Sequence, residues 1–211
     1  MRASHWLITG LFGALFLSGH FGLGPTWLHI WLGYGLITVL LFRLGWGLIG
    51  SDSARWGSLF PAPSRIMAYL PLLFSRQPSR WPGHNPVGAL SALVLIGLLL
   101  IQCLSGLFVE TWSEYRGPLA ERMPRSFMMA MTDLHSVLRW PLLALVIVHL
   151  TAVFAYLGLK RENRIRPIFG NGELILDREP TLEIRGGRRA WTTWLLAAAL
   201  TALVVWLGPV Y

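Results

Sequence analysis

The sequence has few charged residues for a soluble protein of its length, and almost no cysteine. Only 13% of its 211 residues are charged, about half the usual fraction of a soluble domain, where roughly 25% is typical. It has a single cysteine, Cys103, which excludes an intrachain disulfide, a cysteine-rich zinc site and a C-x-x-C-H attachment motif. Cys103 lies in an apolar run, where a small packing residue is the simplest interpretation.

Long apolar runs take the place of the missing charge. Hydrophobic residues make up 54% of the chain and the mean hydropathy is +0.54, which is typical of an integral membrane protein. The net charge of +8 comes from arginines in short connections between apolar runs. Arginines in such connections are typical of the positive-inside bias of membrane proteins. The positive charge therefore does not require a nucleic-acid partner, and no base-stacking motif supports one.

Five segments are long enough to cross a bilayer at 1.5 Å per residue. The sequence therefore predicts an all-α membrane protein, with the first segment retained as a helix because the residues after it lack a signal-peptide cleavage site. Gly24-Pro25 predicts a tight turn between the first two spans. The predicted spans are Trp6–Leu23, Trp27–Ile49, Val87–Val109, Leu134–Leu157 and Trp191–Leu207.

The distribution of arginine predicts the orientation. Basic residues dominate the connections after the second and fourth spans, whereas acidic and basic residues nearly balance between the third and fourth. By the positive-inside rule, the N-terminus is cytoplasmic and the C-terminus lies on the outer side.

Four histidines fall at two depths in this topology. His5 begins the first span at the inner level, and His29 begins the second span at the outer level. His135 begins the fourth span at the outer level, and His149 follows it by fourteen residues, a rise of about 21 Å that returns to within roughly 40° of the same helix face. The depths pair His29 with His135, and His5 with His149.

Paired imidazoles from facing helices are typical axial ligands of haem iron, and without an attachment motif the haems are b-type. The sequence thus predicts a four-helix bundle that holds two stacked haems, with a fifth span outside the bundle. Hydrogen bonding within the membrane is the alternative for a single histidine. No carboxylate joins either pair, which disfavours a zinc or di-iron site.

Two further histidines and two arginines require assignment. His20, near the outer end of the first span, is the rival of His29 as a ligand, and we interpret it as an interfacial residue. His84 precedes Asn85 and Pro86, which together predict a capped helix start. Arg139, one turn after His135, and Arg43, fourteen residues after His29, are candidates to pair with haem propionates. Contact with lipid headgroups explains Arg43 equally well.

Several motifs together carry a family resemblance. The six motifs are R-x-x-H-W at Arg2–Trp6, HIWLGYGLITVLLFRLGWGLIG from His29, ARWGSLF, GHNPVGAL, LHSVL with His149 beyond it, and KRENRIRPIFGNG from Lys160. In these motifs the sequence resembles the bacterial di-haem cytochrome b561 family. That family overlaps with the cytochrome b subunits of nickel–iron hydrogenases. The resemblance covers about residues 2–174 and implies haem ligation by His5, His29, His135 and His149 in a bacterial inner membrane.

The resemblance divides the chain into a di-haem domain, residues 1–170, and a cytoplasmic linker with the fifth span, residues 171–211. Two stacked haems predict electron transfer between membrane quinone and a periplasmic partner such as a c-type cytochrome. Superoxide oxidation coupled to quinone reduction, which some family members perform, is an alternative, although the nearly neutral outer connection lacks a cationic funnel. A haem-free membrane anchor of a partner complex is the third hypothesis.

Overall fold

The computed structural model describes residues 2–51, 54–73, 75, 85–110, 116–163, 165–169 and 187–208, and these residues are helical with short connections. No strand occurs within these ranges, apart from an isolated bridge between Glu110 and Arg116. His84 lies outside them. The α-helices in this part of the chain are α1 (Arg2–Phe21), α2 (Thr26–Ile49), α3 (Pro63–Tyr69), α4 (Pro86–Gly106), α5 (Arg125–Leu159) and α6 (Arg188–Leu207).

Each predicted span coincides with a helix. α2, α4, α5 and α6 are long and apolar enough to cross a membrane. α1 has 20 residues but does not belong to this group, because its two histidines and three glycines lower its hydropathy. α5 begins at Arg125, nine residues before the predicted start, since the mixed polar and apolar segment Arg125–Asp133 continues the helix. The protein is a multi-pass helical membrane protein, and a fifth crossing by α1 stays a prediction.

Local sequence explains where α2 and α4 begin. Gly22 and Gly24 adopt φ values of +64° and +90°, which side chains with a Cβ disfavour, and the chain reverses there between α1 and α2. The Asn85 side chain accepts a hydrogen bond of 2.7 Å from the amide of Gly88, with Pro86 in the first turn of α4. The predicted turn and the predicted cap are both confirmed.

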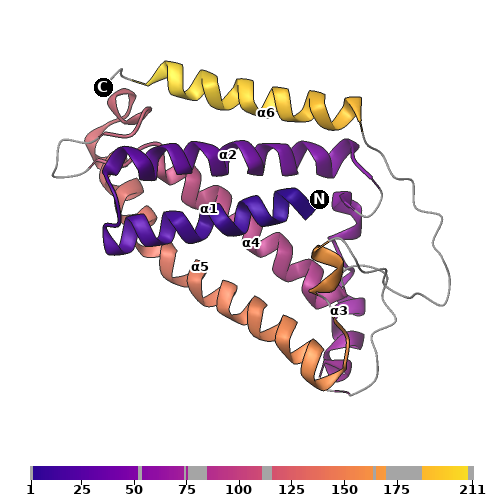
Figure 1. The fold of residues 1–211 in the computed structure, drawn as a ribbon. Helices are drawn as coiled ribbons and strands as arrows, with labels where there is room; N and C mark the ends of the chain where they lie inside the picture. Colours follow the sequence, from indigo (N-terminus) through magenta and orange to yellow (C-terminus); the bar gives the residue numbers. More distant parts are fainter. Residues whose placement is uncertain are drawn as a thin grey trace.

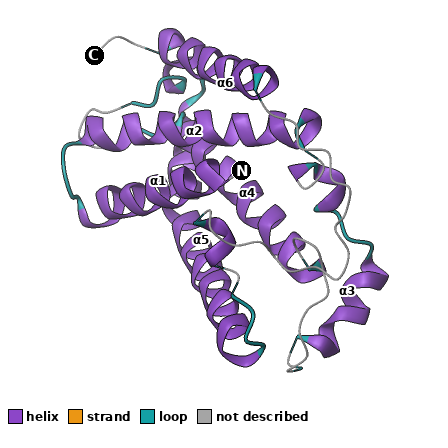
Figure 2. Ribbon diagram, turned by 45° about the vertical axis from the view of Figure 1, so that its right-hand side comes forward, coloured by secondary structure: helices purple, strands orange, loops and turns teal. Residues whose placement is uncertain are grey.

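The helices form two hairpins and one added helix. α1 packs antiparallel to α2, and α4 packs antiparallel to α5 (Figure 1). α6 lies on the side of α2 opposite α1, as both ribbon views show (Figure 2). A core between the hairpins is formed by five buried residues, namely Leu36, Leu40, Leu99, Leu138 and Leu142. Leu36, Leu99 and Leu142 of this core also line a cavity between the hairpins.

α6 packs on α2 through specific contacts. The Thr38 hydroxyl donates a 2.9 Å hydrogen bond to the Thr201 hydroxyl. The rings of Phe42 and Trp194 stack with centroids 4.5 Å apart. On its other side α6 exposes large apolar residues, including Trp191 at 70% and Trp206 at 78%, as expected for a surface that faces lipid. The fifth predicted span is therefore a helix attached to the bundle.

Candidate functional site

The imidazole rings of His29 and His135 face each other between the two hairpins. His29 comes from the first turn of α2 and His135 from α5, and their ring centroids are 6.3 Å apart with the planes at 86°. Both rings line a cavity of about 410 Å³, within the usual size range of ligand pockets. All four helices of the two hairpins contribute to its wall.

Hydrogen bonds fix the tautomer of His135. Its Nδ1 lies 2.9 Å from the carbonyl oxygen of Gln102 and 3.2 Å from the hydroxyl of Ser105, both on α4. A carbonyl oxygen only accepts, so Nδ1 carries the proton and donates. The neutral ring therefore keeps an unshared electron pair on Nε2, which is the state that a metal ligand requires.

His29 is held in the same way by α1. Its Nδ1 lies 2.9 Å from the hydroxyl of Ser18. That hydroxyl donates to the carbonyl of Leu15 at 3.2 Å, so its oxygen accepts the proton of the imidazole. Nε2 of His29 is again the nitrogen with a free electron pair.

A glycine lies beside each of these rings. A Cβ on Gly19 would come within 2.8 Å of Cε1 of His29, and a Cβ on Gly106 within 3.0 Å of Cε1 of His135. Any larger residue would displace the imidazole, so glycine permits the close approach of ring and helix. Each histidine is thus held by a neighbouring helix through a serine and the glycine that follows it.

These serines and glycines were not predicted from the sequence, although the sequence contains a signal for them. Leu17-Ser18-Gly19 in α1 and Leu104-Ser105-Gly106 in α4 repeat the same tripeptide, with phenylalanine two residues after each glycine. Each repeat lies beside a candidate histidine of the partner helix, His29 in α2 and His135 in α5. A search for internal repeats would have revealed the pair.

His5 of α1 and His149 of α5 form the second pair. The two rings are close enough to interact electrostatically, and His5 also packs edge-on against Trp6 at 5.9 Å. Trp6 donates a 3.2 Å hydrogen bond to the carbonyl of Ile168. The structure therefore brings the rings of His29 and His135 face to face, and the pairing of His5 with His149 stays a prediction.

His20 and Arg139 lie at the rim of the cavity. The His20 ring is exposed and packs edge-on against Trp140 at 5.0 Å, whereas His29 is the ring that faces His135. Arg139 lines the cavity and lies 5.6 Å from the Trp140 ring. Its Nε is buried and makes no hydrogen bond, so an anionic group in the cavity would satisfy it.

Arg43 lies in a different environment, between α2 and the segment after it. Its side chain is 6% exposed, donates to the carbonyl of Ala54 at 3.1 Å and lies 4.8 Å from the Trp56 ring. The Trp56 indole in turn donates to the carbonyl of Leu44 at 3.0 Å. The partners described for Arg43 are therefore neutral, and its pairing with a propionate stays a prediction.

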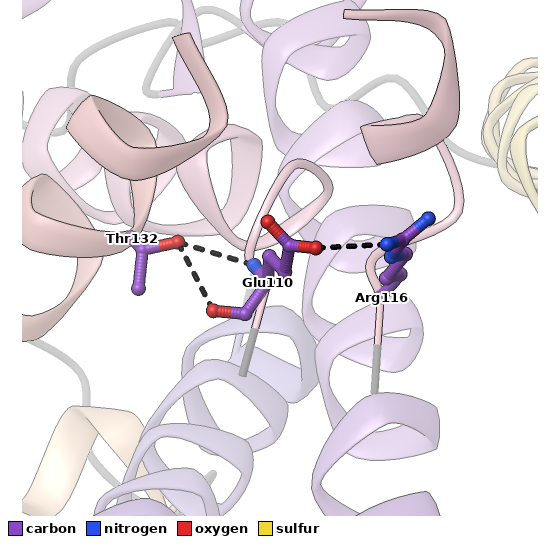
Figure 3. Close-up of polar contacts among 3 residues, drawn as sticks. All are labelled: Glu110, Arg116 and Thr132. Atoms are coloured by element: carbon purple, nitrogen blue, oxygen red, sulfur yellow. Dashed lines mark hydrogen bonds and ion pairs between the residues drawn. The ribbon is translucent and has the colours of Figure 1, made fainter. Parts of the chain in front are cut away.

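The connection between α4 and α5 is fastened beside the cavity (Figure 3). The amide of Glu110 donates to the Thr132 hydroxyl at 3.1 Å, and Thr132 donates to the carbonyl of Met128 at 2.8 Å. Glu110 forms an ion pair of 3.1 Å with Arg116. Since Thr132 also lines the cavity, these bonds hold the connection against the cavity wall.

A polar cluster lies at the far end of α5, beyond His149. Asn85 donates to the Tyr156 hydroxyl at 2.7 Å, and that hydroxyl also bonds the hydroxyl of Tyr69. Lys160, 5% exposed, donates to the carbonyl of Leu72 at 2.7 Å and faces both phenol rings. Tyr156 follows His149 by seven residues, about 10 Å along the same face of the helix.

The residues around the first pair fit a b-type haem. Two neutral imidazoles present free Nε2 electron pairs across an apolar cavity, as bis-histidine ligation requires. The buried Arg139 Nε and Gln102 Oε1 have no partner in the described chain. No group of three or more metal-ligating residues occurs in that part of the chain, so the site is built of histidine pairs, unlike a zinc or di-iron centre.

A helical bundle in the membrane with histidine pairs at two depths defines the class of membrane haem proteins. The model of the prokaryotic cytochrome b561 family matches residues 1–171. The chain belongs to this family. No curated protein and no solved structure matches the sequence. The protein is accordingly a membrane cytochrome that binds b-type haem and takes part in electron transfer.

Proposed function

We propose that the chain holds two b haems, one between His29 and His135 and one between His5 and His149. The observation that carries this proposal is the arrangement of His29 and His135, which face each other with both Nδ1 atoms engaged and both Nε2 atoms free. The second pair repeats the ligand chemistry at the other end of the hairpins.

Haem supplies reversible one-electron chemistry, and the chain supplies ligation, charge and exclusion of water. The four histidines hold the two irons. Arg139 offers a cation to a propionate of the first haem, and Arg43 is the corresponding candidate for the second. The buried leucines between the hairpins, such as Leu36 and Leu142, keep the space between the two sites apolar, which favours electron transfer over reaction with water.

The distribution of arginines gives the proposed orientation of the two haem sites in the membrane. With the positive-inside orientation, the first pair lies at the periplasmic end and the second at the cytoplasmic end of the inner membrane. We infer electron transfer between the membrane quinone pool and a periplasmic redox partner, such as a c-type cytochrome. The periplasmic partner would dock near the connection that Glu110 and Thr132 fasten.

The polar cluster beyond His149 is our candidate for quinone contact. Tyr69, Tyr156, Asn85 and Lys160 combine phenol, amide and ammonium groups at one helix end. Such groups can bind a quinone carbonyl and transfer a proton to it. Their position supports this role, because Tyr156 lies on the same face of α5 as His149.

The proposal is tested on the protein purified in detergent. We expect two haems per chain, and reduction of both by a quinol analogue under anaerobic conditions, measured by absorbance against a dithionite-reduced sample. Tyr156→Phe should slow reduction by quinol and leave reduction by dithionite unchanged. Haem that only dithionite reduces would contradict the quinone link. A folded protein without haem, made with haem available, would leave only the anchor hypothesis.

A further inference from the structure

α1 and α4 make similar contacts with the two facing histidines. In each helix a serine and the glycine that follows it border one imidazole, Ser18 and Gly19 at His29, and Ser105 and Gly106 at His135. The carbonyl of Gln102 in addition accepts from His135. In both, the serine hydroxyl also donates to the carbonyl three residues earlier, at 3.2 Å in α1 and 2.9 Å in α4. The two hairpins are therefore related by an internal repeat at this site.

We propose that Ser18, Gly19, Ser105 and Gly106 are positioning residues that orient both ligands of the first haem and set its reduction potential. This inference rests on the proposed ligation by His29 and His135. The four residues act through the imidazoles and need not touch the haem themselves.

The serines act on the electron-donor strength of the ligands. An acceptor on Nδ1–H makes the imidazole a stronger donor through Nε2. A stronger donor stabilises ferric more than ferrous iron, so the potential of the haem falls. Nδ1 of each proposed ligand has an acceptor, the Ser18 hydroxyl for His29 and the Gln102 carbonyl together with the Ser105 hydroxyl for His135, so the two effects would add on one iron. Within the described residues, the rings of His5 and His149 make no hydrogen bond of this kind, which leaves the second haem as an internal reference.

The glycines act on geometry. The Cε1 atoms of the rings lie within 2.8 Å and 3.0 Å of where a Cβ would be on Gly19 and Gly106, both tighter than ordinary van der Waals contact. An alanine at either position would force the ring away from its helix and out of line with the facing ring. Ligation by that histidine would weaken, because a misaligned ring cannot direct its Nε2 to the shared iron.

The first experiment compares the Ser18→Ala/Ser105→Ala double variant with the wild type. Both proteins are titrated potentiometrically with absorbance and electron paramagnetic resonance readouts. We expect two haems per chain in both proteins, and in the variant one component shifted to higher potential with altered g values while the other stays in place. The Ser18→Thr/Ser105→Thr double variant, which keeps a hydroxyl at both positions, should return the potential toward that of the wild type.

A control for the loss of a hydroxyl is available on α6. Thr192 donates to the carbonyl of Arg189, three residues earlier, at 2.9 Å, but lies on an exposed surface. Thr192→Val should leave both potentials unchanged. Two haems with unshifted potentials in the double serine variant would overturn the positioning role and leave the proposed ligation intact. A wild type without haem would instead overturn the proposed function on which the inference rests.

The second experiment replaces each glycine by alanine, with a glycine two and a half turns earlier, on the opposite face of the same helix, as its control. Gly10 lies nine residues before Gly19, and Gly97 nine residues before Gly106, and a Cβ at either would meet nothing within 4 Å. We expect Gly19→Ala and Gly106→Ala to lower the affinity for one haem, on the order of 10- to 100-fold, while Gly10→Ala and Gly97→Ala retain both. Full retention of both haems with unchanged g values in Gly19→Ala and Gly106→Ala would contradict the proposed role.

Discussion

His29 and His135 face one another across the space between two helical hairpins, with ring centroids 6.3 Å apart. Neither ring is held by its own helix. The hydroxyl of Ser18 in α1 accepts from His29, and the carbonyl of Gln102 in α4 accepts from His135. The geometry of the pair therefore depends on all four helices, so that assembly of the bundle and formation of the ligand pair are one event.

Replacing one histidine of a pair should remove one haem. We expect His29→Ala and His149→Ala each to lower the haem content from two per chain toward one, because a single remaining imidazole binds the iron more weakly. The pyridine haemochrome assay measures the content against protein concentration. His20→Ala is the control, since His20 packs on Trp140 outside the facing pair, and it should retain two haems. Loss of haem in His20→Ala with retention in His29→Ala would reverse the ligand assignment.

Arg139→Gln should lower the potential of the first haem. A cation beside the haem favours the reduced form, which carries less positive charge, so its removal favours the oxidised form. The expected shift is opposite in sign to that of the double serine variant, which separates a charge effect from a ligand effect in the same potentiometric titration. Arg188→Gln, at the exposed start of α6, should leave both potentials unchanged. An unaltered potential in Arg139→Gln would exclude pairing with a propionate.

Thr132→Val should destabilise the protein more than Arg116→Gln does. The valine leaves the amide of Glu110 without its acceptor, at a cost of about 1–3 kcal/mol. Arg116→Gln breaks an ion pair in which the arginine side chain is 47% exposed, and such pairs contribute about 0–1 kcal/mol. Thermal unfolding in detergent, with haem saturated, compares the two variants. A larger loss in Arg116→Gln would show that the ion pair fastens the connection.

Gly47→Ala should destabilise the C-terminal end of α2. Its Cβ would overlap the Trp56 indole, and relief of such overpacking costs about 1–3 kcal/mol. The displaced indole would also leave the buried guanidinium of Arg43, which it covers at 4.8 Å. Gly158→Ala in α5 has open space for its Cβ and should be neutral or slightly stabilising, because alanine favours helix by about 1 kcal/mol over glycine. Equal unfolding temperatures in the two variants would contradict the packing role of Trp56.

The sequence by itself determined the helical membrane class and predicted a depth for each histidine. Apolar runs must be satisfied as helices in a bilayer, and residue number converts directly to height at a fixed rise. His29 and His135 could therefore be predicted to share a level, and the cap at Asn85 could be predicted from its neighbours, because both features depend on residues close in the chain. The predicted boundaries differ from the observed ones mostly at α5, where the segment Arg125–Asp133 extends the helix beyond the predicted span.

Only the tertiary structure decided which side chains surround each ring. Ser18 and Gly19 reach His29 from α1, and Ser105 and Gly106 reach His135 from α4, through contacts that depend on the rotation of each helix against its partner. It also placed Arg43 under Trp56 and α6 against α2. Helical periodicity gives the face of a residue relative to its own helix, but which neighbour that face meets is set by the packing of side chains between helices.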